Sequence, residues 1–200
     1  MFAVGLPNAP DVLTAAVTFS ERFAFRTLER LGAAEAAEVI EGPARALGVA
    51  WDAGLVTRVF ELADGYPYFL QLYGDAVWRE GQPVQGDTLG PGLLVAARRR
   101  VDAELDTMFR ARWSKASAGE RKVLTAMAVL SGLSGLSGTT DAPVRRGDVA
   151  EQMGVSSNDL SVARRSLLDK GLIEAADRGL LRFTVPGFAA FVLAETGTAP

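Results

Sequence analysis

Apolar residues recur every three or four positions through most of the chain, which is the spacing of one face of an α-helix. This pattern predicts helices over residues 52–63, from Pro67 to about residue 80, and from about residue 93 to 113. A shorter helical pattern over residues 33–40 runs into Gly42-Pro43. We expect the helix to break there, because proline lacks a backbone donor and clashes with the preceding turn.

A different succession of elements follows. Ser117 and Glu120 form a capping box ahead of an apolar helix, and two short helical patterns then flank the turn Gly154-Val155-Ser156. Alternating apolar residues next predict a β-hairpin that turns at residues 176–179, and Pro186 opens a last apolar helix. The predicted order is helix, helix, turn, helix and hairpin. This is the order of elements in a winged helix-turn-helix domain with a small β-hairpin wing.

This order makes duplex DNA a candidate partner. In such domains the helix after the turn enters the major groove and the wing lies against the phosphate backbone. The residues expected near base edges are Ser157, Asn158, Ser161 and Arg165, and those expected near phosphates are Arg145, Arg178 and Arg182. Residues 144–185 carry 7 basic and 6 acidic side chains, so a module that faces another protein instead of DNA is the alternative.

Composition narrows the possible functions. The chain has no cysteine and no histidine, which removes disulfides, Cys-type zinc sites and the imidazole base of a Ser-His-Asp triad. We therefore expect no catalytic residues and no metal site. The net charge is −3, yet residues 96–200 carry 15 basic and 12 acidic side chains, so the second half is the electropositive one. Without a long apolar run or a signal-peptide pattern, we expect a cytoplasmic protein that does not bind a membrane.

Six stretches of the sequence, taken in order, resemble one protein family. They are "GLP", "ERFAFRTLERL", "EGPARALGV", "ELADGYPYFLQLYGDAVW", "AELDTMFRARWSKASAGERKVLTAMA" and "LLDKGLIEAADRGLLRFTVPGF". The succession resembles the C-terminal portion of bacterial AAA+ ATPases of the STAND and initiator-like group, and it covers nearly the whole chain. The resemblance implies a mainly α fold, with a remnant of the ATPase core sheet at residues 1–30, a helical lid-like domain at 31–115 and a winged helix at 116–195.

The resemblance also suggests a nucleotide-facing element. Gly65-Tyr66-Pro67 matches the Gly-x-Pro at the start of a lid helix, which lies near bound nucleotide in the family. Taken without the resemblance, the same residues simply begin a helix. The sequence has no Gly-x-x-x-x-Gly-Lys-Ser/Thr loop and no Gly-Lys pair, so we expect no ATPase activity and no cofactor for this chain alone, although the family uses ATP and magnesium.

The favoured function is a non-catalytic regulatory or DNA-binding C-terminal fragment of an AAA+/STAND-like ATPase. One alternative is an ATPase subunit whose nucleotide site is completed by another chain. Another is a winged-helix transcription regulator in which residues 1–115 sense a ligand or dimerise. The partners expected are duplex DNA, an ATPase core or a second copy of the chain.

Overall fold

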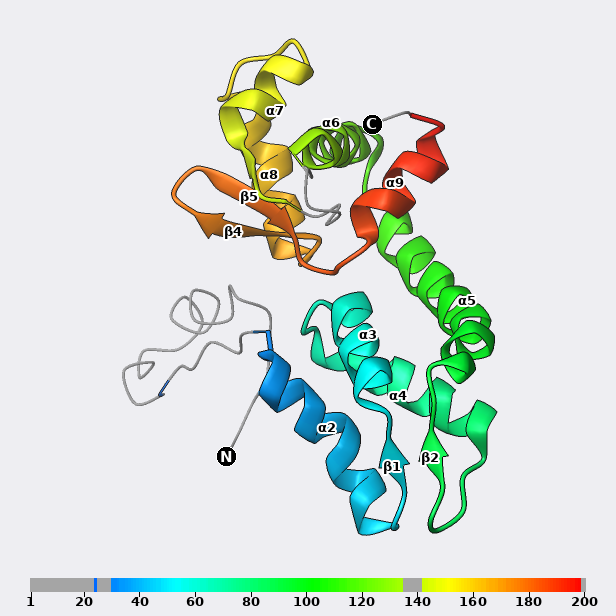
Figure 1. The fold of residues 1–200 in the computed structure, drawn as a ribbon. Coiled ribbons are helices and arrows are strands. Elements are labelled where there is room, and N and C mark those ends of the chain that lie inside the picture. The colour runs from blue at the N-terminus through cyan, green and yellow to red at the C-terminus, as the bar shows by residue number, and fades with distance from the viewer. Residues whose placement is uncertain (1–23, 25–29, 135–141, 199–200) are drawn as a thin grey trace. The chain divides into compact units, whose positions relative to one another are not determined.

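The computed structural model describes residues 24, 30–134 and 142–198, and these residues are mainly helical (Figure 1). The expected core-sheet remnant at residues 1–30 lies almost wholly outside the described residues. The backbone divides into two compact units, a helical unit within Glu29–Met108 and a C-terminal unit that contains Phe109–Pro200. In the part of the chain that is described, no helix has the length and apolar character needed to cross a bilayer.

Three helices and a short strand pair build the helical unit, together with the first part of a long helix. The elements are α2 (Ala33–Ala46), β1 (Ala50–Trp51), α3 (Ala53–Ala63), α4 (Pro67–Gly81), β2 (Thr88–Leu89) and α5 (Gly92–Ser114). β1 pairs with β2 in parallel. Asp52 caps α3, since its Oδ1 accepts hydrogen bonds from the amides of Gly54 at 2.9 Å and Leu55 at 3.2 Å. The helices predicted over 52–63, from Pro67 and over 93–113 are confirmed.

The break expected at Gly42-Pro43 is wrong. α2 continues through Pro43 to Ala46. Ala36, Ile40 and Ala44 are buried at a spacing of four residues, so a single apolar stripe runs across the proline. Proline removes one intrahelical hydrogen bond, and the burial of this stripe on both sides of it keeps the helix continuous.

Four helices and a three-stranded sheet form the C-terminal unit together with the end of α5. The elements are α6 (Ala118–Ser134), β3 (Val144–Arg145), α7 (Arg146–Gln152), α8 (Leu160–Asp169), β4 (Ile173–Asp177), β5 (Leu180–Phe183) and α9 (Phe188–Thr196). The strands lie in the order β3-β5-β4, and both pairings are antiparallel. Helix α6 packs against α7, α8 and α9 (Figure 1).

Local sequence patterns correctly predicted most elements of this unit. The capping box at the start of α6 is present, because the Ser117 amide donates to Glu120 Oε2 at 2.7 Å and the Glu120 amide donates to Ser117 Oγ at 3.3 Å. Leu181 and Phe183 point into the core, while Arg182 lies on the opposite face of β5, as the alternation predicts. β4 extends to Asp177, so the turn is tighter than expected. The third strand, β3, was not predicted.

The last turns of α5 belong to the core of this unit. The ring of Phe109 lies 5.6 Å, between centroids, from those of both Phe188 and Phe191 of α9. Arg112 donates from Nη1 to the carbonyl of Gly171 at 3.1 Å, at the junction between α8 and β4. These contacts fix the C-terminal end of α5 against the elements that carry the predicted DNA-binding residues.

Candidate nucleic-acid interface

Helix α8 has one buried face and one polar, exposed face. Leu160 and Leu167 are buried, whereas Ser161, Val162 and Arg165 are exposed. In the turn before the helix, Asn158 is exposed and Ser157 is half-buried. The structure therefore gathers the four predicted base-contacting residues, Ser157, Asn158, Ser161 and Arg165, on α8 and the turn that leads into it.

The turn before α8 is held by a local hydrogen-bond network. Ser156 donates to Asp159 Oδ2 from its hydroxyl at 2.7 Å and from its amide at 3.0 Å. These two hydrogen bonds to the carboxylate hold the pKa of Asp159 below its usual value. The turn thus fixes where Ser157 and Asn158 sit relative to the helix.

One end of the three-stranded sheet gathers three arginines. Arg145 of β3 pairs with Leu180 of β5, and the Arg146 amide donates to the carbonyl of Gly179 at 2.9 Å, next to Arg178. Within the described residues, the guanidinium groups of Arg145, Arg146 and Arg178 form no ion pair. This cluster, called the arginine end, holds two predicted phosphate ligands. It also holds Arg146, which sequence reasoning missed because β3 was not predicted.

The third predicted phosphate ligand has a different environment. Arg182 pairs across the hairpin with Glu174, with 2.9 Å between Arg182 Nε and Glu174 Oε1, and the two side chains are only 34% and 26% exposed. Arg165 on α8 also has an acidic neighbour, Asp169 at 3.3 Å, but that pair is exposed and one helical turn apart. Of these two cations, Arg182 is the more strongly neutralised within the fold.

Gly65-Tyr66-Pro67 forms the connection between α3 and α4. Gly65 has φ +65°, its carbonyl accepts from the Leu31 amide at 2.9 Å, and an added Cβ would lie 2.3 Å from the Leu31 oxygen. Tyr66 precedes the first residue of α4, and Pro67 occupies its first turn. The local fold accounts for Gly65 and Pro67, and the nucleotide-facing role of the three residues stays a prediction.

A partly buried ion pair joins α6 to the end of α8. Glu120 is only 6% exposed, and Lys170 Nζ lies 2.6 Å from its Oε2. Burial raises the pKa of Glu120, but hydrogen bonds from Lys170, Ser166 and the Ser117 amide outweigh it and lower the pKa to about 2. Sequence reasoning assigned Glu120 to the capping box alone. The structure shows that the same carboxylate also anchors α8.

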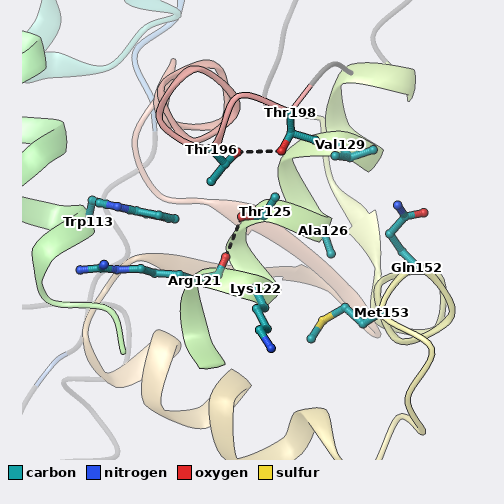
Figure 2. Close-up of a pocket in the computed structure, with 10 residues that line it drawn as sticks. All are labelled: Trp113, Arg121, Lys122, Thr125, Ala126, Val129, Gln152, Met153, Thr196 and Thr198. Carbon is teal, nitrogen blue, oxygen red and sulfur yellow. Dashed lines mark hydrogen bonds between the residues drawn. The ribbon is translucent and has the colours of Figure 1, made fainter. Parts of the chain in front are cut away.

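A groove of about 470 Å³ lies along α6 (Figure 2). Ala126 and Val129 are among the residues that line it, and the Arg121 guanidinium lies over the Trp113 ring at 5.0 Å from the centroid. The Thr125 hydroxyl is engaged, since it donates to the Arg121 carbonyl at 2.8 Å. None of the predicted site residues lines the groove, and no group of acidic side chains able to hold a metal ion occurs in the described segments.

Residues 106–192 match the family described as "Domain of unknown function (DUF8462)". No curated protein matches the chain. Among solved structures the chain is similar to two mutant forms of RuvB from Thermotoga maritima, each with 16% identity over 91% of this chain, with TM-scores of 0.39 and 0.40. The chain covers 54% and 55% of these two RuvB chains, or about half their length, and a likeness of this degree carries no functional conclusion.

Proposed function

We propose that residues 116–195 form a winged helix that binds duplex DNA, and that the chain is a non-catalytic, regulatory part of an AAA+-related ATPase. The observation that carries the proposal is the solvent-exposed face of α8. Ser161 and Arg165 project from this face, and the opposite face of the helix is buried. A helix of this kind offers hydroxyl and guanidinium groups to base edges in a major groove. The sheet order β3-β5-β4, with a hairpin after α8, supports the winged-helix assignment.

The arginine end supplies the phosphate-binding part of the proposal. Arg145 and Arg178 are exposed and Arg146 is half-exposed, and in the described residues no carboxylate neutralises them. Cations of this kind release condensed counterions from DNA and so determine how steeply affinity falls with salt. Arg182 is a weaker candidate, because Glu174 would have to release it first.

The ATPase part of the proposal rests on the sequence resemblance. The sequence lacks a P-loop, so we propose that this chain alone hydrolyses no ATP and needs no cofactor. A nucleotide near Gly65-Tyr66-Pro67 would then be held by an ATPase core that lies outside these 200 residues. That core and a second copy of this chain are the proposed protein partners.

The test is fluorescence anisotropy of a labelled pool of random DNA duplexes titrated with the full chain at several salt concentrations. Replacing Arg145, Arg146 and Arg178 together by alanine should weaken binding to all sequences alike. It should also reduce the slope of log affinity against log salt by about 2 to 3, close to one for each phosphate that is no longer neutralised.

The matched control replaces three exposed arginines of the helical unit, Arg58, Arg79 and Arg98, each of which pairs with an acidic residue on its own helix. It changes the net charge equally and should leave the salt slope unchanged. If the wild-type chain binds no duplex at low salt, the DNA-binding proposal is wrong. The ion pairs of Arg182 with Glu174 and of Arg165 with Asp169 would then favour the alternative, in which this surface contacts another protein.

A further inference from the structure

Val162 occupies the centre of the exposed face of α8. Its side chain is 82% exposed, more than that of any other large apolar residue among those described. It precedes Arg165 by three residues, so on the helix its side chain lies beside that of Arg165, and Ser161 lies one turn before Arg165. Single exposed valines are common on protein surfaces, and the position of this one is what distinguishes it.

The fold gains nothing from a valine at this position. An 82% exposed side chain buries almost no apolar area, and a β-branched residue is a weaker helix former than alanine. The neighbouring exposed positions on this face, Asn158, Ser161 and Arg165, are all polar. A surface that meets only water or phosphates has no need of an apolar group here.

Base pairs present one apolar group in the major groove, the C5-methyl of thymine. We infer that Val162 contacts this methyl group and makes α8 prefer thymine at one position of its DNA site. The inference rests on the proposed DNA binding of α8. It adds a specificity-determining residue that cannot form hydrogen bonds and therefore discriminates only by the methyl group.

The experiment uses the full chain and DNA in which a single methyl group is removed. A randomised duplex library is first enriched for binding, and each thymine of the enriched site is then replaced in turn by deoxyuridine, which keeps every hydrogen-bonding atom. At one position the replacement should weaken wild-type binding about fourfold, the factor that corresponds to one buried methyl group. With Val162→Ala, thymine and deoxyuridine should bind equally well at that position.

Val95→Ala is the matched control, because Val95 is another strongly exposed valine on a helix, but in the helical unit. This variant should keep the fourfold preference. Binding that shows no deoxyuridine effect, or a preference that survives in Val162→Ala, overturns this inference alone and leaves the proposed function standing. A wild-type chain that binds no duplex overturns both. Circular dichroism of Val162→Ala, expected to match wild type, confirms that its fold is intact.

Discussion

Replacing Glu120 by glutamine tests how α8 is held in place. Glutamine has the same size and can still accept the Ser117 amide, so the capping box survives. What is lost is the charge that pairs with Lys170, at 2.6 Å in a site where the carboxylate side chain is 8% exposed. The glutamine oxygen can still accept a hydrogen bond from Lys170, but the half-buried ammonium group loses the negative charge that compensates it, which destabilises the folded unit.

The size of the effect follows from the pKa of Glu120, which falls from 4.5 to about 2. A difference of this size corresponds to about 3 kcal/mol of unfolding free energy at neutral pH. Because the folded pKa is the lower one, the contribution is complete above the unfolded value of 4.5 and disappears as the pH falls through about 2. Wild type should therefore exceed Glu120→Gln by about 3 kcal/mol at neutral pH, and the gap should close in acid.

The assay is urea unfolding followed by the fluorescence of Trp113. Replacing Trp51 and Trp78 by phenylalanine leaves Trp113 as the sole tryptophan, and it lies in the C-terminal unit. Asp169→Asn is the matched control, since it removes the exposed partner of Arg165 on the same helix and should cost less than about 1 kcal/mol. A loss in Glu120→Gln no larger than in this control, or a gap that is unchanged between about pH 5 and pH 3, would refute the reasoning.

Three further predictions concern other parts of the chain. Gly65→Ala should destabilise the helical unit by about 2 kcal/mol or more, because alanine is strained at φ +65° and its Cβ would meet the Leu31 carbonyl; urea unfolding followed by Trp51 and Trp78 measures this. Arg112→Ala should lower the stability of the C-terminal unit by about 1 kcal/mol, since Thr184 Oγ1 still donates to the Gly171 carbonyl at 2.7 Å, and Trp113 reports the loss. Calorimetry and a phosphate-release assay with magnesium ATP should detect only weak binding and no turnover; tight binding or turnover above buffer would contradict a non-catalytic chain.

Local patterns in the sequence predicted local structure well. The alternation of Leu181 and Phe183 with Arg182 assigned the two faces of β5, because side chains alternate strictly along a strand. The capping box at Ser117 and Glu120 marked the start of α6 for a similar reason, since both of its hydrogen bonds span three residues. Signals of this kind also placed the four candidate base-contacting residues on and beside α8.

Features that depend on distant residues were missed. β3 has two residues and no alternation, so only its pairing with β5 identifies it as a strand. Glu120 and Lys170 are 50 residues apart, and no local pattern links them. The pairing of Arg182 with Glu174 follows from the hairpin register, which depends on a register shift between Ala175 and Asp177 that the sequence did not indicate. Packing also overrode a local signal at Pro43, where the helix continues.

The pairing of β3 with β5 determines when this part of the protein can fold during its synthesis. Val144 pairs with Leu181, and the intervening chain contains both α7 and α8. On the ribosome these helices emerge before their partner strand, so the arginine end cannot assemble until β5 has been synthesised. Closing so long a loop carries an entropic cost that only the finished sheet and core offset. A truncation before β5 should therefore abolish the proposed DNA binding even though every residue of α8 is present.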